Sequence, residues 1–282
     1  MAAVLGTNVA SLWASKNLQS AQSNMANSVE RLSSGLRINR ARDDAAGLGI
    51  SNALTQQINS ADQGVRNLND GISIAQTAEG AMAQASEMAQ RILTLAVQAT
   101  NGSLNTTQKN SIQAQMSALI TAIDSINTRT KFSDTTLLAG TTITIYTGSS
   151  TAESVSISSA ALATISSASG GLAATLSGWI TSASGTTNAA TYQSVATSAA
   201  TYITALDTQR GALGAIQNQM EYSVNNIVEL SANLSSARSR VIDTDYATET
   251  SNLTKGQILQ QAATAMLAQA NQMPNVILSL LK

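Results

Sequence analysis

The sequence of 282 residues contains neither histidine nor cysteine. It therefore lacks the imidazole of most general acid–base catalysts, the thiol nucleophile, and the ligands of the usual Cys/His zinc sites. Disulfide bonds are excluded as well. We accordingly expect no enzymatic activity, no metal and no cofactor.

Proline, aromatic residues and charge are also scarce. There is one proline, eight residues are aromatic, and 11% are charged, against roughly 25% in an ordinary soluble domain. A net charge of −1 gives no electrostatic basis for nucleic-acid binding. No apolar run approaches the roughly 18 residues of a membrane-spanning helix, and the first residues do not resemble a cleaved signal peptide. Forty-seven alanines favour long, closely packed helices over an ordinary globular core.

Composition divides the chain into two similar arms and a central insert. Residues 141–200 contain one charged residue, Glu153, but 26 serines and threonines. Within them, residues 142–146 (TITIY) and 154–157 (SVSI) alternate polar and apolar side chains around a turn-rich segment, which predicts a β-hairpin. For residues 160–200 the sequence indicates only small irregular structure with some helix.

The first arm has the periodicity of a long helix. Apolar residues between Leu54 and Ala99 recur at spacings of four and three, with one 3–3 step at Ile72, Ala75 and Ala78 that indicates a stammer. Asn101-Gly102 ends this helix. Asn105, followed by Gln108, predicts the capping box of a second helix that folds back against the first.

The second arm carries a strict heptad that predicts a coiled-coil helix. Its positions are Leu206, Leu213, Met220, Ile227, Leu234 and Val241. Thinner apolar stripes occur near both termini. They comprise Leu18, Ala21, Met25, Val29, Leu32 and Leu36 at one end, and Leu259, Ala263, Met266, Ala270, Met273, Ile277 and Leu280 at the other. Such thin stripes do not compensate for the entropy of ordering a helix, so we expect them to fold against partners.

Two further features have alternative interpretations. The pairs Asp43-Asp44 and Asp243/Asp245 contain carboxylates that could bind a cation or act as acid and base. We favour the alternative that they lie near helix starts, where they complement the helix dipole, with Arg40 and Arg42 beside the first pair. The Ser/Thr-rich insert predicts either an O-glycosylated outer face or an unmodified polar surface, and composition does not distinguish them.

Several motifs, in order along the chain, resemble those of bacterial flagellins. Residues 30–39 read ERLSSGLRIN and residues 41–47 read ARDDAAG. The further matching segments are NDGISIAQTAEGA at 69–81, LAVQ at 95–98, LGAIQN at 213–218, SARSR at 236–240, DYATE at 245–249, QILQQA at 257–262, LAQANQ at 267–272 and LSLLK at 278–282. The resemblance covers roughly residues 1–140 and 203–282.

The resemblance implies a mainly α fold, in which a long antiparallel bundle or coiled coil is built from both termini and carries a small β-hairpin in an irregular outer insert. Residues 1–44 and 243–282 would form an inner terminal coiled coil, 45–140 and 201–242 an outer helical layer, and 141–200 a surface insert. We expect thirteen residues to pack between subunits: Leu18, Met25, Leu32, Leu36, Arg31, Arg37, Arg42, Asp43, Leu259, Met266, Met273, Ile277 and Leu280.

The same resemblance implies a subunit that leaves the cell unfolded by flagellar type III export and polymerises into an extracellular filament for motility. The implied partners are further copies of the chain, the cap and hook-junction proteins, a chaperone at the C-terminal segment, and a host pattern-recognition receptor; no nucleic acid or membrane is implied. The receptor surface would be formed by Arg91, Leu95, Gln98 and Gln115, the last in place of an acidic residue. From the residues alone, Arg91 is equally a partner for Glu87.

Two alternative functions share these terminal helices. One is a hook–filament junction protein, present in few copies. The other is a surface adhesin that binds polysaccharide through its insert. The match through the final Leu-Leu-Lys favours a flagellin.

Overall fold

The computed structural model describes residues 7–148, 153–158, 162–163, 165–166, 173–182 and 188–280, except for the side chains of Thr175, Trp179, Ser182 and residues 273–280. The chain divides into two compact units. We call residues 1–56 with 233–282 the terminal unit, and residues 57–232 the central unit.

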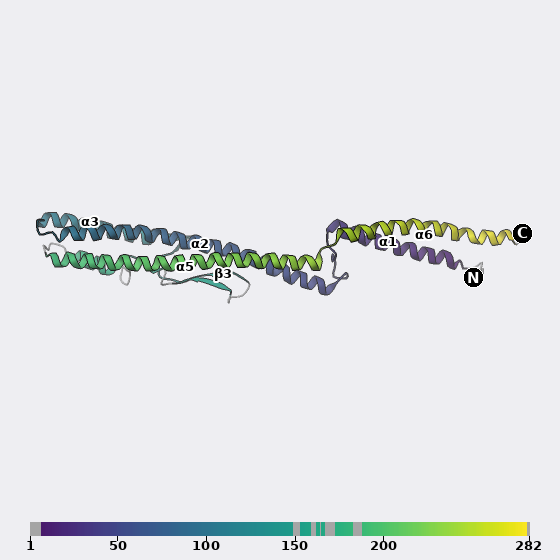
Figure 1. The fold of residues 1–282 in the computed structure, drawn as a ribbon, viewed down its shortest axis with the longest axis horizontal. Coiled ribbons are helices and arrows are strands. Elements are labelled where there is room, and N and C mark those ends of the chain that lie inside the picture. Colours follow the sequence, from purple (N-terminus) through teal and green to yellow (C-terminus); the bar gives the residue numbers. More distant parts are fainter. Residues whose placement is uncertain are drawn as a thin grey trace. The chain divides into compact units, whose positions relative to one another are not determined.

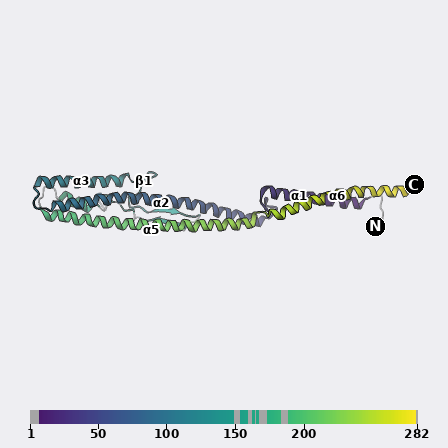
Figure 2. The ribbon, with the colours of Figure 1, turned by 45° about the horizontal axis from the view of Figure 1, so that its top comes forward.

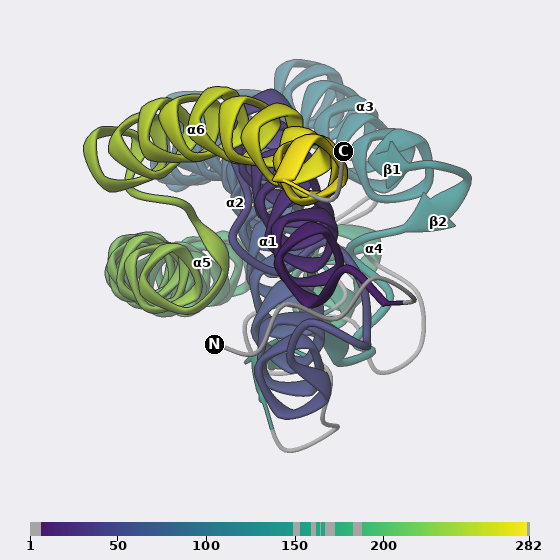
Figure 3. The ribbon, with the colours of Figure 1, turned by 90° about the vertical axis from the view of Figure 1, so that its right-hand side faces the viewer.

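The terminal unit is built around two antiparallel helices, α1 (Val9–Ser34) and α6 (Tyr246–Leu280), which lie side by side (Figures 1 and 3). The side chain of Asn8 caps the start of α1 by accepting a hydrogen bond from the Ser11 N–H. Gly35 ends α1 in the left-handed conformation (φ 72°), and its N–H donates to the Arg31 carbonyl. Each terminal stripe therefore forms a helix, and the two helices run alongside each other.

The central unit contains parts of the long helices α2 (Ala45–Ala99) and α5 (Ala189–Ile242), together with α3 (Thr106–Arg129) (Figure 2). It also contains the short helix α4 (Ala174–Ser182) (Figure 3). The predicted helix break at Asn101-Gly102 is confirmed, as is the capping box of Asn105 and Gln108. Residues 189–200, which the composition groups with the insert, form the first turns of α5.

The core of the central unit follows a regular heptad along α2. From Gly64 to Ala99 one series of buried positions is separated alternately by four and three residues, with Ile74, Ser86 and Leu95 buried beside it. Many members of the series are alanines without any exposed surface. The predicted stammer is wrong: Gly71, rather than Ile72, is the buried member of that turn, so the repeat continues without interruption. A glycine is invisible to an apolar pattern although it permits the close contact that the pattern is meant to detect.

In α5 the predicted coiled-coil positions Leu206, Leu213 and Met220 are fully buried. The core position between Leu206 and Leu213 belongs to a polar residue, Gln209, which is also buried. Its Oε1 atom has no hydrogen-bond partner among the described residues.

Two small antiparallel hairpins complete the central unit. The predicted hairpin is confirmed as β3 (Ile143–Tyr146) paired with β4 (Ser154–Ile157), and its apolar side chains are the more buried ones. Its backbone lies against α2 at Gly64, where an added Cβ would collide with the Thr147 carbonyl oxygen. The second hairpin, β1 (Lys131–Phe132) with β2 (Thr135–Thr136), was not predicted.

Candidate functional site: the apolar surface of the terminal helices

Most of the buried positions in the seam between α1 and α6 carry small side chains. On α1 the buried residues are Ala14, Ala21 and Ser28, seven residues apart. On α6 the buried positions follow the same period and comprise Glu249, Gly256 and Ala270, with Ala263 half-buried. An added Cβ at Gly256 would lie 3.4 Å from the Met25 Cβ, so the two helices approach closely there.

The apolar stripe predicted on α1 coincides with this seam only in part. Leu18, Met25 and Leu32 are half-buried along it, as predicted, but Val29 is about half exposed and Ser28 takes its place in the seam. A serine does not register in an apolar pattern. Its position seven residues after Ala21 is the signal that would have identified it.

Other large apolar side chains lie outside the seam and are exposed. On α1, Leu12 and Trp13 are 61% and 60% exposed; on α6, Ile258 and Met266 are 61% and 65% exposed. Two of them, Trp13 and Met266, line the same groove, and such a gathering of large exposed apolar residues is unusual on a monomeric surface. Sequence periodicity indicated Met266 but neither Trp13 nor Leu12.

Part of this surface is a groove of about 710 Å³ between the two helices. Its lining is mostly apolar and comprises Val9, Ala10, Trp13, Ala14, Asn17, Ser20, Ala21, Asn24, Leu259, Ala262, Ala263, Met266, Gln269 and Ala270. Alanines form much of the lining, with Trp13, Leu259 and Met266 as the larger exposed members. We refer to this site as the terminal groove. Its shape and chemistry fit an apolar helix side chain better than a polar ligand.

The end of α1 is fixed to the chain around Asp243 by main-chain contacts. Leu36 and Asp243 form an isolated antiparallel bridge, and the Thr244 N–H donates to the Gly35 carbonyl over 3.0 Å. Arg37 donates twice to the last turn of α5: its N–H to Ile242 and its guanidinium to the Val241 carbonyl, at 2.7 and 2.6 Å. The segment that follows α1 is therefore hydrogen-bonded to the end of α5 and to the segment that leads into α6.

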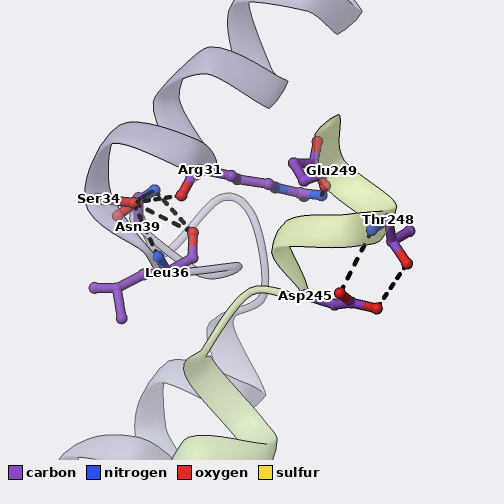
Figure 4. Close-up of polar contacts among 7 residues, drawn as sticks. All are labelled: Arg31, Ser34, Leu36, Asn39, Asp245, Thr248 and Glu249. Atoms are coloured by element: carbon purple, nitrogen blue, oxygen red, sulfur yellow. Dashed lines mark hydrogen bonds and ion pairs between the residues drawn. The ribbon is translucent and has the colours of Figure 1, made fainter. Parts of the chain in front are cut away.

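Side chains reinforce this junction (Figure 4). Asn39 donates to the Ser34 hydroxyl and to the Leu36 carbonyl, holding the chain that leaves α1. From α1, Arg31 extends to Glu249 on α6, with 3.8 Å between its guanidinium and the buried carboxylate. This ion pair joins α1 to α6 near the end of α1.

Of the first carboxylate pair, Asp44 caps a helix start as expected, whereas Asp43 stabilises the turn that precedes it. Asp43 accepts hydrogen bonds from the backbone N–H groups of Arg40 and Asn39, and the first of these is the main cause of its lowered pKa. Asp44 accepts from the Gly47 N–H at the start of α2. Among the residues that the structure describes, no cluster of acidic side chains is arranged to hold a metal ion.

Asp245 caps α6 in the same way. Its carboxylate accepts hydrogen bonds from the Thr248 hydroxyl at 2.7 Å and from the backbone N–H groups of Ala247 and Thr248 (Figure 4). The Thr248 hydroxyl is the main cause of the lowered pKa of Asp245, followed by these backbone groups. Each of these bonds stabilises the ionised carboxylate.

The charged residues predicted to pack between subunits all make contacts inside the chain. Arg31 pairs with Glu249, Arg37 binds carbonyls of α5, and Arg42 lies 3.6 Å from Asp43. Leu36 is half-buried at the junction, whereas Leu259 and Met266 line the terminal groove. The side chains of Met273, Ile277 and Leu280 lie outside the described residues. The inter-subunit role of these residues stays a prediction.

The predicted receptor surface lies in the central unit. Arg91 and Gln98 on α2 and Gln115 on α3 are exposed, but Leu95 is 3% exposed and belongs to the core. Leu95 is therefore not available for direct contact in this fold. No ion pair joins Arg91 to Glu87 among the described side chains, so that interpretation of Arg91 is not supported.

No helix in the described part of the chain is both long enough and apolar enough to cross a membrane. The alanine-rich helices are interrupted too often by polar side chains.

Comparison with known proteins finds matches at both ends of the chain. Residues 5–142 match the family described as "Bacterial flagellin N-terminal helical region", and residues 197–281 match "Bacterial flagellin C-terminal helical region". The span between them includes the β3–β4 hairpin, α4 and the start of α5.

Whole proteins also match. Flagellin B of Vibrio cholerae serotype O1 is 34% identical over 375 aligned positions, which cover all of both chains. The flagellin of Bacillus subtilis strain 168 is 38% identical over 299 positions, covering 98% of each chain. The crystal structure of Bacillus cereus flagellin aligns with 61% of this chain and 94% of its own, with 22% identity and a TM-score of 0.47.

Proposed function

The chain belongs to the bacterial flagellin family, and from that membership we propose how its terminal helices serve assembly. It is a structural subunit that polymerises with copies of itself into the extracellular filament of the bacterial flagellum, for motility. The proposal assigns no catalytic activity to it.

One observation carries the proposal: the terminal groove and the exposed side chains beside it. The seam between α1 and α6 buries mostly small residues, while Trp13, Ile258 and Met266 stay in solvent. A further copy that covers these side chains would gain about 25 cal/mol for each Å² of apolar surface removed from water. We propose that the terminal groove and its rim are an interface between subunits.

The symmetry of such an interface follows from its chemistry. The groove is concave and lined with alanine, so its partner is a different, projecting surface of the next copy rather than the same groove. Contacts between different surfaces do not close on themselves unless the rotation between copies forms a ring, so they generate an open helical polymer. A filament is the expected result.

The proposed arrangement places residues 1–44 and 243–282 in an inner coiled coil, residues 45–140 and 201–242 in the layer around it, and 141–200 on the outside. The predominance of apolar exposed residues on α1 and α6 supports the inner position of the first group. The near absence of charge and the 26 hydroxyl side chains of residues 141–200 suit a hydrated outer surface.

Further partners complete the proposal. Cap and hook-junction proteins would contact the ends of the polymer. Before export, a chaperone would cover the apolar side of α6, where Ile258 and Leu259 are exposed. The absence of cysteine suits a chain that is exported unfolded and has no crosslinks to form afterwards.

We also propose that a host receptor contacts Arg91, Gln98 and Gln115. All three are exposed, and Leu95 beneath them supports α2 from the core rather than contacting the receptor. Receptor signalling should fall when Arg91→Ala is applied as soluble protein. Signalling equal to that of the unmodified chain would refute this part of the proposal.

Seeded polymerisation tests the assembly interface. Purified chain is mixed with short fragments of its own filaments, and the sedimentable protein is followed over time with electron microscopy of the product. Trp13→Glu places a charge in the terminal groove and should abolish elongation, because a buried unpaired charge is costly.

Gln19→Glu is the matched control. Gln19 is also exposed on α1 but does not line the groove, so the same charge there should leave elongation close to normal. Circular dichroism of both variants shows whether the subunit itself is intact. Equal elongation by the two variants would contradict the assigned interface.

A further inference from the structure

The corner between α2 and α3 contains a reactive pair of residues. Asn101-Gly102 is the one Asn-Gly dipeptide in the sequence. It lies in the turn between Ala99, where α2 ends, and Thr106, where α3 begins. Both residues are exposed to solvent, and an added Cβ at Gly102 would meet nothing within 4 Å.

Hydrogen bonding in this corner activates the asparagine side chain. The Ser103 N–H donates to Asn101 Oδ1 over 3.0 Å, which withdraws electrons from the side-chain carbonyl carbon Cγ. The Gly102 N–H has no partner among the described residues, so no hydrogen bond has to break before this nitrogen reacts. Glycine also permits the backbone rotation that brings its nitrogen to Cγ, since it has no Cβ.

We infer that Asn101 is a site of spontaneous modification, at which the chain converts its own asparagine to aspartate and isoaspartate. The Gly102 nitrogen loses its proton and attacks Cγ of Asn101, and the bond from Cγ to the side-chain nitrogen breaks as ammonia leaves. The product is a five-membered succinimide. Water then opens either of its two carbonyls, giving aspartate or, with one extra methylene in the main chain, isoaspartate.

Asn110 is an exposed asparagine that helical structure protects. Asn110 is followed by Ser111, a small residue, and both are exposed, but they lie within α3. There the Ser111 N–H belongs to the i→i−4 ladder, and the helical backbone holds it away from the preceding side chain. Asn110 is therefore an internal control in the same protein.

The reaction changes the charge of the subunit at the corner between α2 and α3. The formal net charge of −1 becomes more negative by one unit at neutral pH. The new carboxylate lies just beyond the last turn of α2, which contains no basic residue to compensate it. A negative charge at a helix C-terminus opposes the helix dipole, so the product should fray α2 locally.

The experiment uses the purified full-length chain, incubated at 37 °C and sampled over weeks. Peptide mass spectrometry measures conversion at Asn101 and Asn110, an isoaspartyl methyltransferase labels isoaspartate, and isoelectric focusing separates the charge forms. The peptide containing Asn101 should account for most of the conversion. Its rate should rise about tenfold per pH unit, because the deprotonated fraction of a very weak acid rises in that proportion.

Two variants complete the test. Gly102→Ala has room for its Cβ and requires no left-handed backbone, so it should keep the fold yet slow conversion by hindering ring closure. Asn101→Gln should lose the isoaspartate signal of this peptide altogether. Equal conversion at Asn101 and Asn110, or an unchanged rate in Gly102→Ala, would overturn the proposal.

Discussion

Shortening Met266 should weaken the filament far more than it weakens the subunit. The side chain is 65% exposed in the isolated chain, so Met266→Ala removes little that stabilises α6 itself. Complete burial of a methionine side chain is worth about 1.5–3 kcal/mol, and about two thirds of that gain is still available to a partner. The variant should therefore lose roughly 1–2 kcal/mol per subunit contact, a factor of about 5–30 in the critical concentration for polymerisation.

The critical concentration is measured as the soluble protein that remains in equilibrium with seeded filaments after sedimentation. Gln257→Ala is the matched control, because Gln257 is exposed on the same helix, has a similar size, and does not line the terminal groove. Urea unfolding of the soluble subunits checks that both variants keep their stability. If Met266→Ala and Gln257→Ala had the same critical concentration, the argument that a partner subunit buries the exposed side chain of Met266 would be refuted.

Four further outcomes follow from the structure. Gly64→Ala should destabilise the central unit by about 1–3 kcal/mol in urea unfolding, since its Cβ would collide with the Thr147 carbonyl; unchanged stability would show that the hairpin is not held there. Asp134→Gly should stabilise the central unit by about 1 kcal/mol, because Asp134 has a positive φ of 66°, which glycine adopts without strain. A loss of stability would contradict the inference that this φ is strained. Gln209→Leu should stabilise by about 1–3 kcal/mol by removing an unpartnered buried oxygen, unless that oxygen binds ordered water, in which case stability would fall. The pKa of Asp245 is lowered below its ordinary value of 3.8, so its contribution to the free energy of unfolding is complete above about pH 4 and is lost as the pH falls through the lower folded pKa. Circular dichroism should show this loss of helix in the unmodified chain and not in Asp245→Ala.

Much of the helical architecture could be predicted because its signals are local. The capping box of Asn105 and Gln108 requires only two residues at the correct spacing, and the heptad of α5 repeats often enough to be unambiguous. The β3–β4 hairpin was equally visible as an alternating pattern. In each case the pattern and the interaction that it produces lie close together in sequence.

The remaining errors have a common physical cause. Ser28, Gly71 and Gly256 occupy buried seam positions because they are small, whereas an apolar pattern detects only side chains that are large. The same limitation misplaced the repeat at Ile72 and included Val29 in a seam that it does not enter.

The assignment of Leu95 to an exposed surface was wrong for a different reason. Arg91, Leu95 and Gln98 are three or four residues apart, so they share one side of a helix, but the edge of a core can pass between them. Whether Leu95 is covered depends on how the neighbouring helices pack, which spacing alone does not specify. The exposed Trp13 depends in the same way on the direction from which α6 approaches.

Gly64 and Gly71 on α2 hold the β3–β4 hairpin against the helix, so residues inserted into the hairpin loop would not alter the helix packing. An added Cβ at Gly64 would reach the Thr147 backbone, and one at Gly71 would lie 3.0 Å from Ile145, so both contacts fix β3 and the residue that follows it on α2. Sequence added between residues 148 and 153 would begin and end on this anchored ladder of four paired residues. Its main cost would be loop closure, about 0.6 kcal/mol for each doubling of length. The loop of this hairpin is therefore a site where a foreign peptide can be inserted while the helix–helix contacts stay unchanged.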